Sequence, residues 1–590
     1  MKGKNKVKGF RMMKRRRMQW LISGSLSIVL FMITYLTTDV LFSTNDDIRI
    51  MYALAGYNTG EPYACHPFIN FFLGKFISVQ YQLFPEIPWY AVFHCTCLFV
   101  GTVVIGKCLY KIAEKRKCPV YIPMIFQIVL FYTILIFPVV SMQFSTTPAV
   151  LGIAAAVLVY SLDITNDERK YIYGDLVMSI LFLFVCYMTR SFTWYCVMCF
   201  YGLAIFYQLI HFFPKFTKEG KNWIIVFGGC IIITVIGVVG LRTSSLYIKD
   251  KMELNKEFEV YNEYRTEFQD YRKRPNYEEN IPFYQNIGWT ENTYRAVLAL
   301  VFLDENINAD SMQKITEEYE NSSKGRTLAD AYSTAISIFQ EKRVAKTGIA
   351  VIIFLFVSIL MISIRNRQLW CELLCSSLGF FGYCVMFFYL SYRGRLPIRT
   401  FMVITISEAV LLFAFLMSVL RTPIRKKTYL FFSSICMGLF LLVAYNIRAI
   451  YLTDECTKTQ TKTSATVEQV IDFEQYALEH QEDVFIYDFT VATEQREPFV
   501  VYPNQRPTNC IISGGSYTFS SIYYQQLKTN HMDSLYWENL LEDNIFYVSA
   551  DISFVELVQK NIEGKMGKEI KYKEIESFGN SGVKIYKFVD

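Results

Sequence analysis

Two adjacent carboxylates, Asp46 and Asp47, stand just after the first long apolar segment, in the stretch STNDD. Carboxylates that follow cap-type residues are favoured in the first turn of a helix, so capping is one interpretation. The same position keeps a carboxylate ionised, as a general base or a metal ligand requires. The residues alone leave both interpretations open. We predict Asp46 and Asp47 as the catalytic candidates, without deciding which of them acts.

A histidine follows the aspartate pair in the same stretch of chain. His66 precedes Pro67 and is one of only 5 histidines in the sequence. An imidazole can bind a substrate or assist proton transfer, whereas a lone histidine is more often structural. We retain His66 as a candidate substrate-binding residue, with the structural role as the alternative.

A short basic loop, SYRGRLPIRT, contains Arg393, Arg395 and Arg399. A guanidinium matches phosphate oxygens bidentately, so these residues are predicted to hold a lipid phosphate. Pairing with acidic outer loops or contact with lipid headgroups is the alternative. Arg190, in YMTRSFTWY, is a further candidate for this anionic site, and snorkelling at a helix end explains it equally well.

The segment GWTENTY combines Trp289, Glu291 and Asn292. An aromatic face packs against sugar C–H groups while Glu and Asn hydrogen-bond hydroxyl groups, so the three are predicted to bind a carbohydrate substrate. The alternative is a capping box in which Thr290 or Asn292 opens the helix that follows.

Long apolar segments must position these candidates. The chain has 590 residues, of which 53% are hydrophobic and only 19% charged, fewer charges than soluble proteins carry. Crossing a bilayer takes roughly 17–25 apolar residues. We therefore predict an α-helical polytopic membrane protein with about eleven spans, at 20–41, 89–110, 120–140, 146–162, 174–189, 192–213, 223–241, 347–364, 369–390, 401–420 and 428–450.

Basic residues set the predicted orientation, because Lys and Arg concentrate in cytoplasmic loops. With the N-terminus inside, the same side receives Lys107, Lys111, Lys115, Arg116, Lys117, Arg169, Lys170, Lys215, Lys218, Lys221, Arg365, Arg367, Arg421, Arg425, Lys426 and Lys427. Residues 67–84 are apolar but short, and Lys75 lies in their middle. We read them as a helix along the outer interface, since a crossing there would place the later basic loops outside.

This topology gives the predicted domains. Residues 1–19 form a basic cytoplasmic N-terminus and residues 20–450 the transmembrane domain. The latter includes a first outer loop at 42–88 and a long outer loop at 242–346. Residues 451–590 are predicted to be a small extracytoplasmic α/β domain, since four strand-like runs and one helical run occur there.

The motifs and their sidedness resemble the GT-C superfamily of integral membrane glycosyltransferases. They are similar, more narrowly, to a group of membrane proteins of Gram-positive bacteria through SxNDD, GxxTGxP, a following His, PxIPWY, GWTEN and GRLPIR. The resemblance covers most of the membrane part and none of the tail. It implies a GT-C-like fold and a first-loop carboxylate that acts at the acceptor, here Asp46 or Asp47. It also implies that the arginines of SYRGRLPIRT bind the carrier phosphate.

The resemblance further implies transfer of a sugar from a polyprenyl-phosphate carrier, such as undecaprenyl phosphate. The acceptor would be a cell-envelope glycan, as in polysaccharide biosynthesis, or a lipid-linked saccharide, at the outer face of the cell membrane. The expected partners are these substrates and membrane lipid, with no nucleic acid. No cofactor is certain, and the need for a divalent cation stays open because the superfamily contains members of both kinds. The alternatives are a lipid or polysaccharide transporter or flippase, and a non-enzymatic envelope assembly factor.

Overall fold

The computed structural model describes most of the chain. The described residues are 2–212, 218–251, 255–322, 326–341, 343–364, 366–394, 396–420, 438, 465–491, 498–499, 507–579 and 582–590. They divide into two compact units, which we name by their content. The helical unit comprises Met1–Leu41, Ala91–Arg242 and Thr327–Thr459, and the mixed unit comprises Phe42–Tyr90, Thr243–Arg326 and Gln460–Asp590.

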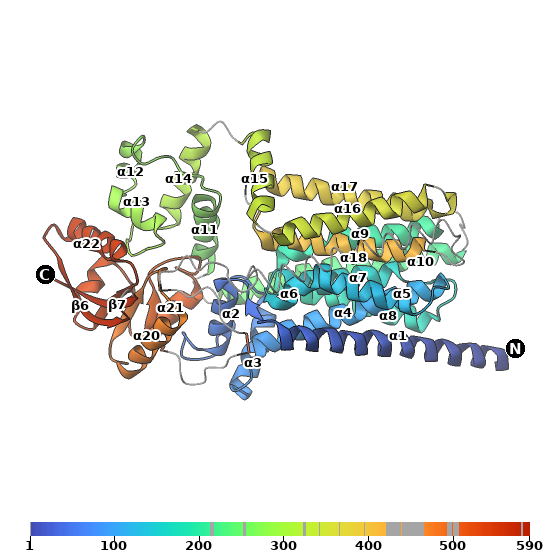
Figure 1. Cartoon of the computed structure of the whole chain (residues 1–590). Coiled ribbons are helices and arrows are strands. Elements are labelled where there is room, and N and C mark those ends of the chain that lie inside the picture. Colours follow the sequence, from blue (N-terminus) through green and yellow to red (C-terminus); the bar gives the residue numbers. More distant parts are fainter. Residues whose placement is uncertain are drawn as a thin grey trace. The chain divides into compact units, whose positions relative to one another are not determined.

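The helical unit is built from long apolar helices (Figure 1). Nine helices of the described chain are long and apolar enough to cross a membrane, which fits the predicted multi-pass membrane protein. The elements that contribute to them are α1 (Lys2–Thr37), α4 (Trp89–Lys115), α5 (Tyr121–Leu130) with η1 (Phe131–Leu135) and α6 (Ile136–Val140), α8 (Arg169–Thr189), α9 (Ser191–Phe212), α10 (Lys218–Asp250), α16 (Arg343–Ser363), α17 (Trp370–Tyr392) and α18 (Ile398–Val419).

Two helices form the centre of this unit. Every residue of α7 (Thr146–Tyr160) is buried, and the spanning window of α18 is buried completely. α7 packs against α8, α9 and α18. With 15 residues α7 is about 22 Å long, shorter than the hydrocarbon core. Because neighbouring helices cover it, its length need not match the lipid. The predicted span at 428–450 lies almost wholly outside the described residues.

The mixed unit gathers three segments that are far apart in sequence. The first is the predicted outer loop, with α2 (Asn45–Ala55) and α3 (Phe71–Leu83). The second is the long loop, whose buried core includes Phe268, Tyr284 and Trp289. The third is the tail. The helices of the long loop are α11 (Asn255–Arg265), η2 (Thr266–Asp270), α12 (Ile281–Asn286), α13 (Glu291–Leu298) and α14 (Ala309–Ser322).

The tail folds as a five-stranded sheet with helices (Figure 1), which agrees with the predicted small α/β domain and adds a strand to the four predicted. The strand order is β4-β3-β5-β7-β6; β3 is parallel to β4 and β5, whereas β7 is antiparallel to β5 and β6. Its elements are α20 (Val467–Glu479), β3 (Val484–Tyr487), β4 (Cys510–Ile512), α21 (Ser521–Thr529), η4 (Trp537–Leu541), β5 (Ile545–Ser549), α22 (Ile552–Met566), β6 (Lys571–Phe578) and β7 (Val583–Val589).

Alternating residues of the sheet fill two cores. Phe485 of β3 packs in a cluster with Phe473 of α20, while its neighbour Ile486 packs in another cluster with Trp537 and Val555. This is the alternation of a strand that is covered on both faces. The sequence pattern missed β4, because a three-residue strand is too short to show a period.

Helix α3 corresponds to the segment predicted to lie along the membrane. It has 13 residues and is therefore about 20 Å long, too short to span the hydrocarbon core. Leu73 and Ile77 are buried, whereas Phe76 is 60% exposed and Leu83 62% exposed. This one-sided pattern is typical of a helix that can rest on an apolar interface.

Candidate functional site

The first turn of α2 contains both predicted catalytic aspartates. Thr44 takes the N-cap position with an extended backbone (φ −144°, ψ 156°), and α2 begins at Asn45. Asp46 and Asp47 therefore lie in the first turn, where the helix dipole favours negative charge. The cap-type sequence predicted this helix start correctly.

The chain reverses sharply after α2. Gly56 ends the helix with a φ of +82°, and the Tyr63 N–H donates to the Ala53 carbonyl at 2.8 Å. A Cβ at Gly56 would lie 2.5 Å from the carbonyl carbon of Glu61. Only glycine fits this turn, which brings the following residues back along the helix.

Asp47 is held in place by two hydroxyl groups. Thr44 Oγ1 donates to Asp47 Oδ2 at 2.9 Å, and Tyr90 Oη donates to Asp47 Oδ1 at 3.1 Å. The side chain of Asp47 has no exposed surface. A substrate cannot reach a carboxylate that is covered in this way, so its position suits a role in orienting α2.

Asp46 is the more accessible of the two aspartates. It is half-buried, and its main-chain carbonyl accepts a hydrogen bond from Tyr517 Oη at 3.3 Å. Tyr517 belongs to the tail, so a residue distant in sequence fixes the backbone at the candidate base. No pattern around Asp46 predicted this contact.

His66 lies beside the same tyrosine. Its ring is 5.2 Å from the Tyr517 ring in an edge-on arrangement, and its Nδ1 accepts from the Phe68 N–H at 3.2 Å. The side chain is completely buried. His66 is therefore near Asp46 through Tyr517, but its burial fits a positioning role and not direct substrate contact.

The tail holds the first loop at two further points. Ser521 Oγ donates to the Cys65 carbonyl and Thr529 Oγ1 donates to the Thr59 carbonyl, both at 3.1 Å. Ala53 of α2 and Ile522 of α21 share a small apolar cluster. The first loop and the tail thus form one surface within the mixed unit.

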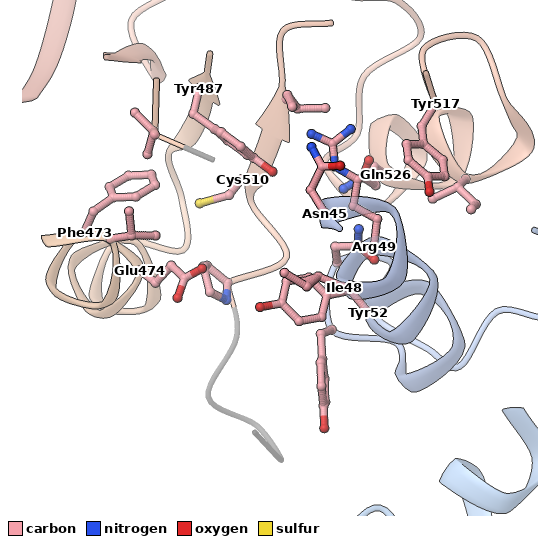
Figure 2. A pocket seen from close by; sticks show the side chains of 17 residues that line it. Asn45, Ile48, Arg49, Tyr52, Phe473, Glu474, Tyr487, Cys510, Tyr517 and Gln526 are labelled. Carbon is pink, nitrogen blue, oxygen red and sulfur yellow. The ribbon is translucent and has the colours of Figure 1, made fainter. Parts of the chain in front are cut away.

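A cavity opens between α2 and the tail (Figure 2). Its volume is about 930 Å³ including the mouth. Asn45, Arg49 and Tyr52 reach it from α2, whereas Phe473 and Glu474 come from α20. Tyr517 lines the cavity, and its hydroxyl contacts the main-chain carbonyl of Asp46, whose neighbour Asn45 also lines the cavity. None of these lining residues was predicted from the sequence as a site residue.

The predicted phosphate-binding arginines belong to the helical unit. The Arg190 guanidinium lies 4.7 Å from the centre of the Phe144 ring, just after α8. Arg393 is exposed at the end of α17, and Arg399 is half-buried in the first turn of α18. Arg395 lies outside the described residues.

The residues of the GWTEN segment pack against the protein itself. Trp289 is 1% exposed, its Nε1 donates to the Asn306 carbonyl at 2.9 Å, and its ring stacks on Tyr284. A ring covered on both faces cannot stack on a sugar, so the carbohydrate interpretation does not fit the placement of Trp289. Burial, which the residue type does not encode, decides between the two interpretations.

The predicted alternative for this segment was helix capping, and Thr290 provides it. The Thr290 side chain caps α13 by accepting a hydrogen bond from the Thr293 N–H at 3.1 Å. Glu291 is exposed and pairs with Arg295 at 2.5 Å one turn later. Asn292 is half-buried, and its carbonyl accepts from Asn561 of α22 at 3.3 Å. These contacts start the helix and attach it to the tail.

No metal centre is evident in the described ranges. Within them, no group of three or more His, Cys, Asp or Glu side chains converges in a way that could hold a metal ion. Both oxygens of Asp47 already accept hydroxyl hydrogen bonds, which makes this carboxylate a poor ligand.

Comparison with known proteins adds no identity. The chain matches no model of a protein family, and no curated protein is similar to it.

Proposed function

We propose that the chain is a membrane glycosyltransferase that transfers a sugar from a polyprenyl-phosphate carrier to a cell-envelope glycan or a lipid-linked acceptor. The observation that carries the proposal is the half-buried Asp46, which lies in the first turn of α2 next to a cavity with aromatic and polar walls. The nine apolar helices of the described chain support the membrane location that a lipid-linked donor requires.

Asp46 acts as the general base in this proposal. It accepts the proton of the acceptor hydroxyl while the acceptor oxygen bonds to the anomeric carbon of the sugar. The bond from that carbon to the carrier phosphate breaks, and the phosphate leaves with the electron pair. Asp47, fixed by Thr44 and Tyr90, keeps the first turn of α2 in position.

The arginines of the helical unit take the carrier end in the same proposal. Arg393, Arg395 and Arg399, with Arg190 as a further candidate, hold the lipid phosphate and stabilise the charge that it gains on leaving. The structure describes three of these arginines, Arg190, Arg393 and Arg399. Arg393 is exposed and Arg399 is half-buried, which supports their part in the proposal. The N-terminus is cytoplasmic and the tail extracytoplasmic in this scheme, following the distribution of basic loops.

The test is transfer of a radiolabelled sugar by the purified full chain in lipid vesicles. The donor is an undecaprenyl-phosphate hexose, and the acceptor is an envelope-glycan extract. We expect transfer by the wild type and by Asp39→Asn, an exposed control close to the site in sequence. Asp46→Asn should lower the rate at least a hundredfold, the usual effect of losing a general base. Equal rates in Asp46→Asn and wild type would refute the assignment.

A second candidate function rests on Glu408. This glutamate is 1% exposed in the middle of α18, and within the described chain neither of its carboxylate oxygens has a hydrogen-bond partner. An ionisable group in such a place marks ion or proton pathways in transporters. Loss of vesicle uptake of a polyprenyl-linked saccharide in Glu408→Gln, with uptake intact in Asp46→Asn, would favour a transporter.

A further inference from the structure

The cavity between α2 and the tail is a hollow that is open at its mouth. Its empty space of about 930 Å³ includes the open solvent at the mouth, so this value is an upper bound on the enclosed volume. Four parts of the mixed unit line it: α2 with the turn that follows, helix α20, the strands β3 and β4, and helix α21 with the preceding Tyr517. Figure 2 shows α2 and α20 on opposite sides of the space.

The walls combine two kinds of side chain. Aromatic rings offer flat apolar faces: Tyr52, Tyr57 and Tyr487 are partly exposed, whereas Phe473 and Tyr517 line the cavity from buried positions. Amides and charged groups offer donors and acceptors, and these are Asn45, Arg49, Asn58, Glu474 and Gln526. A sugar ring has C–H faces that pack on aromatic rings and hydroxyls around its edge that both donate and accept. The mixture of amide donors and acceptors therefore matches a saccharide.

Asn58 adds a specific indication of a ligand. Its Oδ1 is buried and accepts no hydrogen bond from the described part of the protein. A buried acceptor without a hydrogen-bond donor lowers the stability of the fold. A hydroxyl of a bound ligand would supply the missing donor.

The charges of the walls are balanced. Arg49 and Glu474 are the basic and the acidic residue among the described residues that line the cavity. The Arg49 guanidinium lies 5.3 Å from the centre of the Tyr517 ring, so an aromatic face already accommodates part of its charge. A phosphate or polyanionic ligand would be repelled by Glu474 and would find one cation, Arg49, among the described lining residues. The cavity consequently favours a neutral ligand.

The sheet contributes the ends of two strands to the cavity. β3 and β4 are parallel neighbours, and their last residues, Tyr487 and Ile512, both line the cavity. In open α/β sheets, ligands bind outside the carboxyl ends of parallel strands, beside the point where the strand order reverses. β3 lies between β4 and β5, so the reversal falls between β3 and β5, and the cavity lies on the other side of β3, at the ends of β3 and β4.

From these observations we infer that the cavity binds a neutral oligosaccharide segment and holds the acceptor beside Asp46. This inference rests on the proposed function in one respect, namely that the bound saccharide is the acceptor of the reaction. Tyr517 links the cavity to Asp46, because it lines the cavity and its hydroxyl donates to the Asp46 carbonyl. Binding itself requires neither the donor nor turnover. The tail, which carries no catalytic motif, thereby acquires the role of a recognition domain.

Direct binding to the purified full chain in detergent tests the inference. The probes are neutral di- to tetrasaccharides of glucose, galactose and their N-acetylamino forms, with trigalacturonic acid and inorganic phosphate as anionic comparisons. Saturation-transfer NMR and calorimetry report binding. We expect at least one neutral probe to bind, with affinity at least tenfold weaker in Glu474→Ala and in Asn58→Ala. The control Glu479→Ala changes an exposed carboxylate on the same helix and should leave affinity unchanged.

The outcomes separate this inference from the proposed function. Neutral-probe binding that depends on Glu474 supports the saccharide site even in a chain without transferase activity. Transfer activity with an acceptor KM that Glu474→Ala leaves unchanged would keep the function and overturn the site. Binding of the anionic probes alone, binding equal in Glu474→Ala and Glu479→Ala, or binding of no probe would also overturn it.

Discussion

The two units hold their buried carboxylates in different ways. In the helical unit, Asp175 pairs with Arg16 and with Lys107, whose Nζ lies 3.0 Å from Asp175 Oδ1. Glu372 of the same unit lies 2.6 Å from the Arg116 guanidinium. These partners are cations, as apolar surroundings require for a charge that water cannot reach.

In the mixed unit, hydroxyl and N–H groups surround the buried carboxylates. Asp488 accepts from the Thr490 N–H at 2.8 Å and from Tyr547 Oη at 2.9 Å. Asp304 accepts from the Asn306 N–H at 2.9 Å and from the Trp537 indole at 3.3 Å. Neither forms an ion pair within the described residues. A carboxylate without a neighbouring cation binds a proton more readily, which suits acid–base chemistry. Glu408 of the helical unit is the exception there, because its buried carboxylate has no hydrogen-bond partner among the described residues.

The largest predicted effect breaks an ion pair of the helical unit. Asp175→Asn leaves the fully buried Lys107 without its carboxylate and should lower the free energy of unfolding by about 3–5 kcal/mol. Asp310→Asn removes an exposed pair with Lys314 and should cost at most about 1 kcal/mol. Denaturant unfolding in detergent measures both. Equal losses in the two variants would contradict the distinction.

A smaller effect is expected in the pH dependence of stability, to which a buried carboxyl group of the mixed unit contributes. Burial raises the pKa of Asp488 to about 6 from an ordinary value of 3.8, while hydrogen bonds from Ser549, Thr490 and Tyr547 oppose the rise. The folded chain therefore binds more protons than the unfolded chain between these values, and stability falls as pH rises from 4 to 7. At about 1.4 kcal/mol per pKa unit the loss is about 3 kcal/mol.

Thermal unfolding of the full chain at pH 4 and pH 7 measures this loss. Asp488→Asn cannot ionise, so the part of the pH dependence due to Asp488 should disappear in that variant. A pH dependence of the same size in wild type and Asp488→Asn would show that the Asp488 carboxylate is already ionised at pH 4.

The next effect in size is the loss of stability when a hydroxyl group that donates to Asp47 is removed. Tyr90→Phe removes one of them and leaves the buried Asp47 Oδ1 without that hydrogen bond, which should cost about 1–3 kcal/mol of stability. Tyr389→Phe is the control, because the side chain of Tyr389 is 58% exposed. Hydrogen exchange of the α2 amides should rise in Tyr90→Phe alone; unchanged exchange would mean that the hydroxyl does not anchor the helix.

The smallest effect is expected at the GWTEN segment. Glu291→Gln breaks an exposed pair with Arg295 one helical turn away and should change stability by no more than about 0.5 kcal/mol. Sugar transfer should stay within twofold of wild type. A tenfold loss of transfer would restore Glu291 as a substrate-binding residue.

The apolar spans were predictable because length and hydropathy act locally. Nine of the predicted spans correspond to helices of crossing length, and 146–162 corresponds to the shorter, fully buried α7. The start of α2 was equally local, since Ser43, Thr44 and Asn45 prefer helix caps. The strands β5, β6 and β7 followed from their alternation.

Long-range packing set the features that the sequence did not reveal. Tyr517 reaches the Asp46 carbonyl across most of the chain, and no spacing encodes that contact. The cavity likewise needs α2 and α20 to face each other. Trp289 illustrates the converse, because tryptophan suits both a sugar platform and a protein core, and only its burial identifies the core.

The central claim is that Asp46 removes the proton of the acceptor, and measuring donor binding and turnover separately tests it most directly. Asp46→Asn should bind the undecaprenyl-phosphate hexose with an affinity within threefold of wild type, because the arginines are unchanged. Release of undecaprenyl phosphate in the presence of acceptor should fall at least a hundredfold in Asp46→Asn and remain normal in Asp39→Asn. Turnover by Asp46→Asn within twofold of wild type, at equal donor binding, would contradict the account.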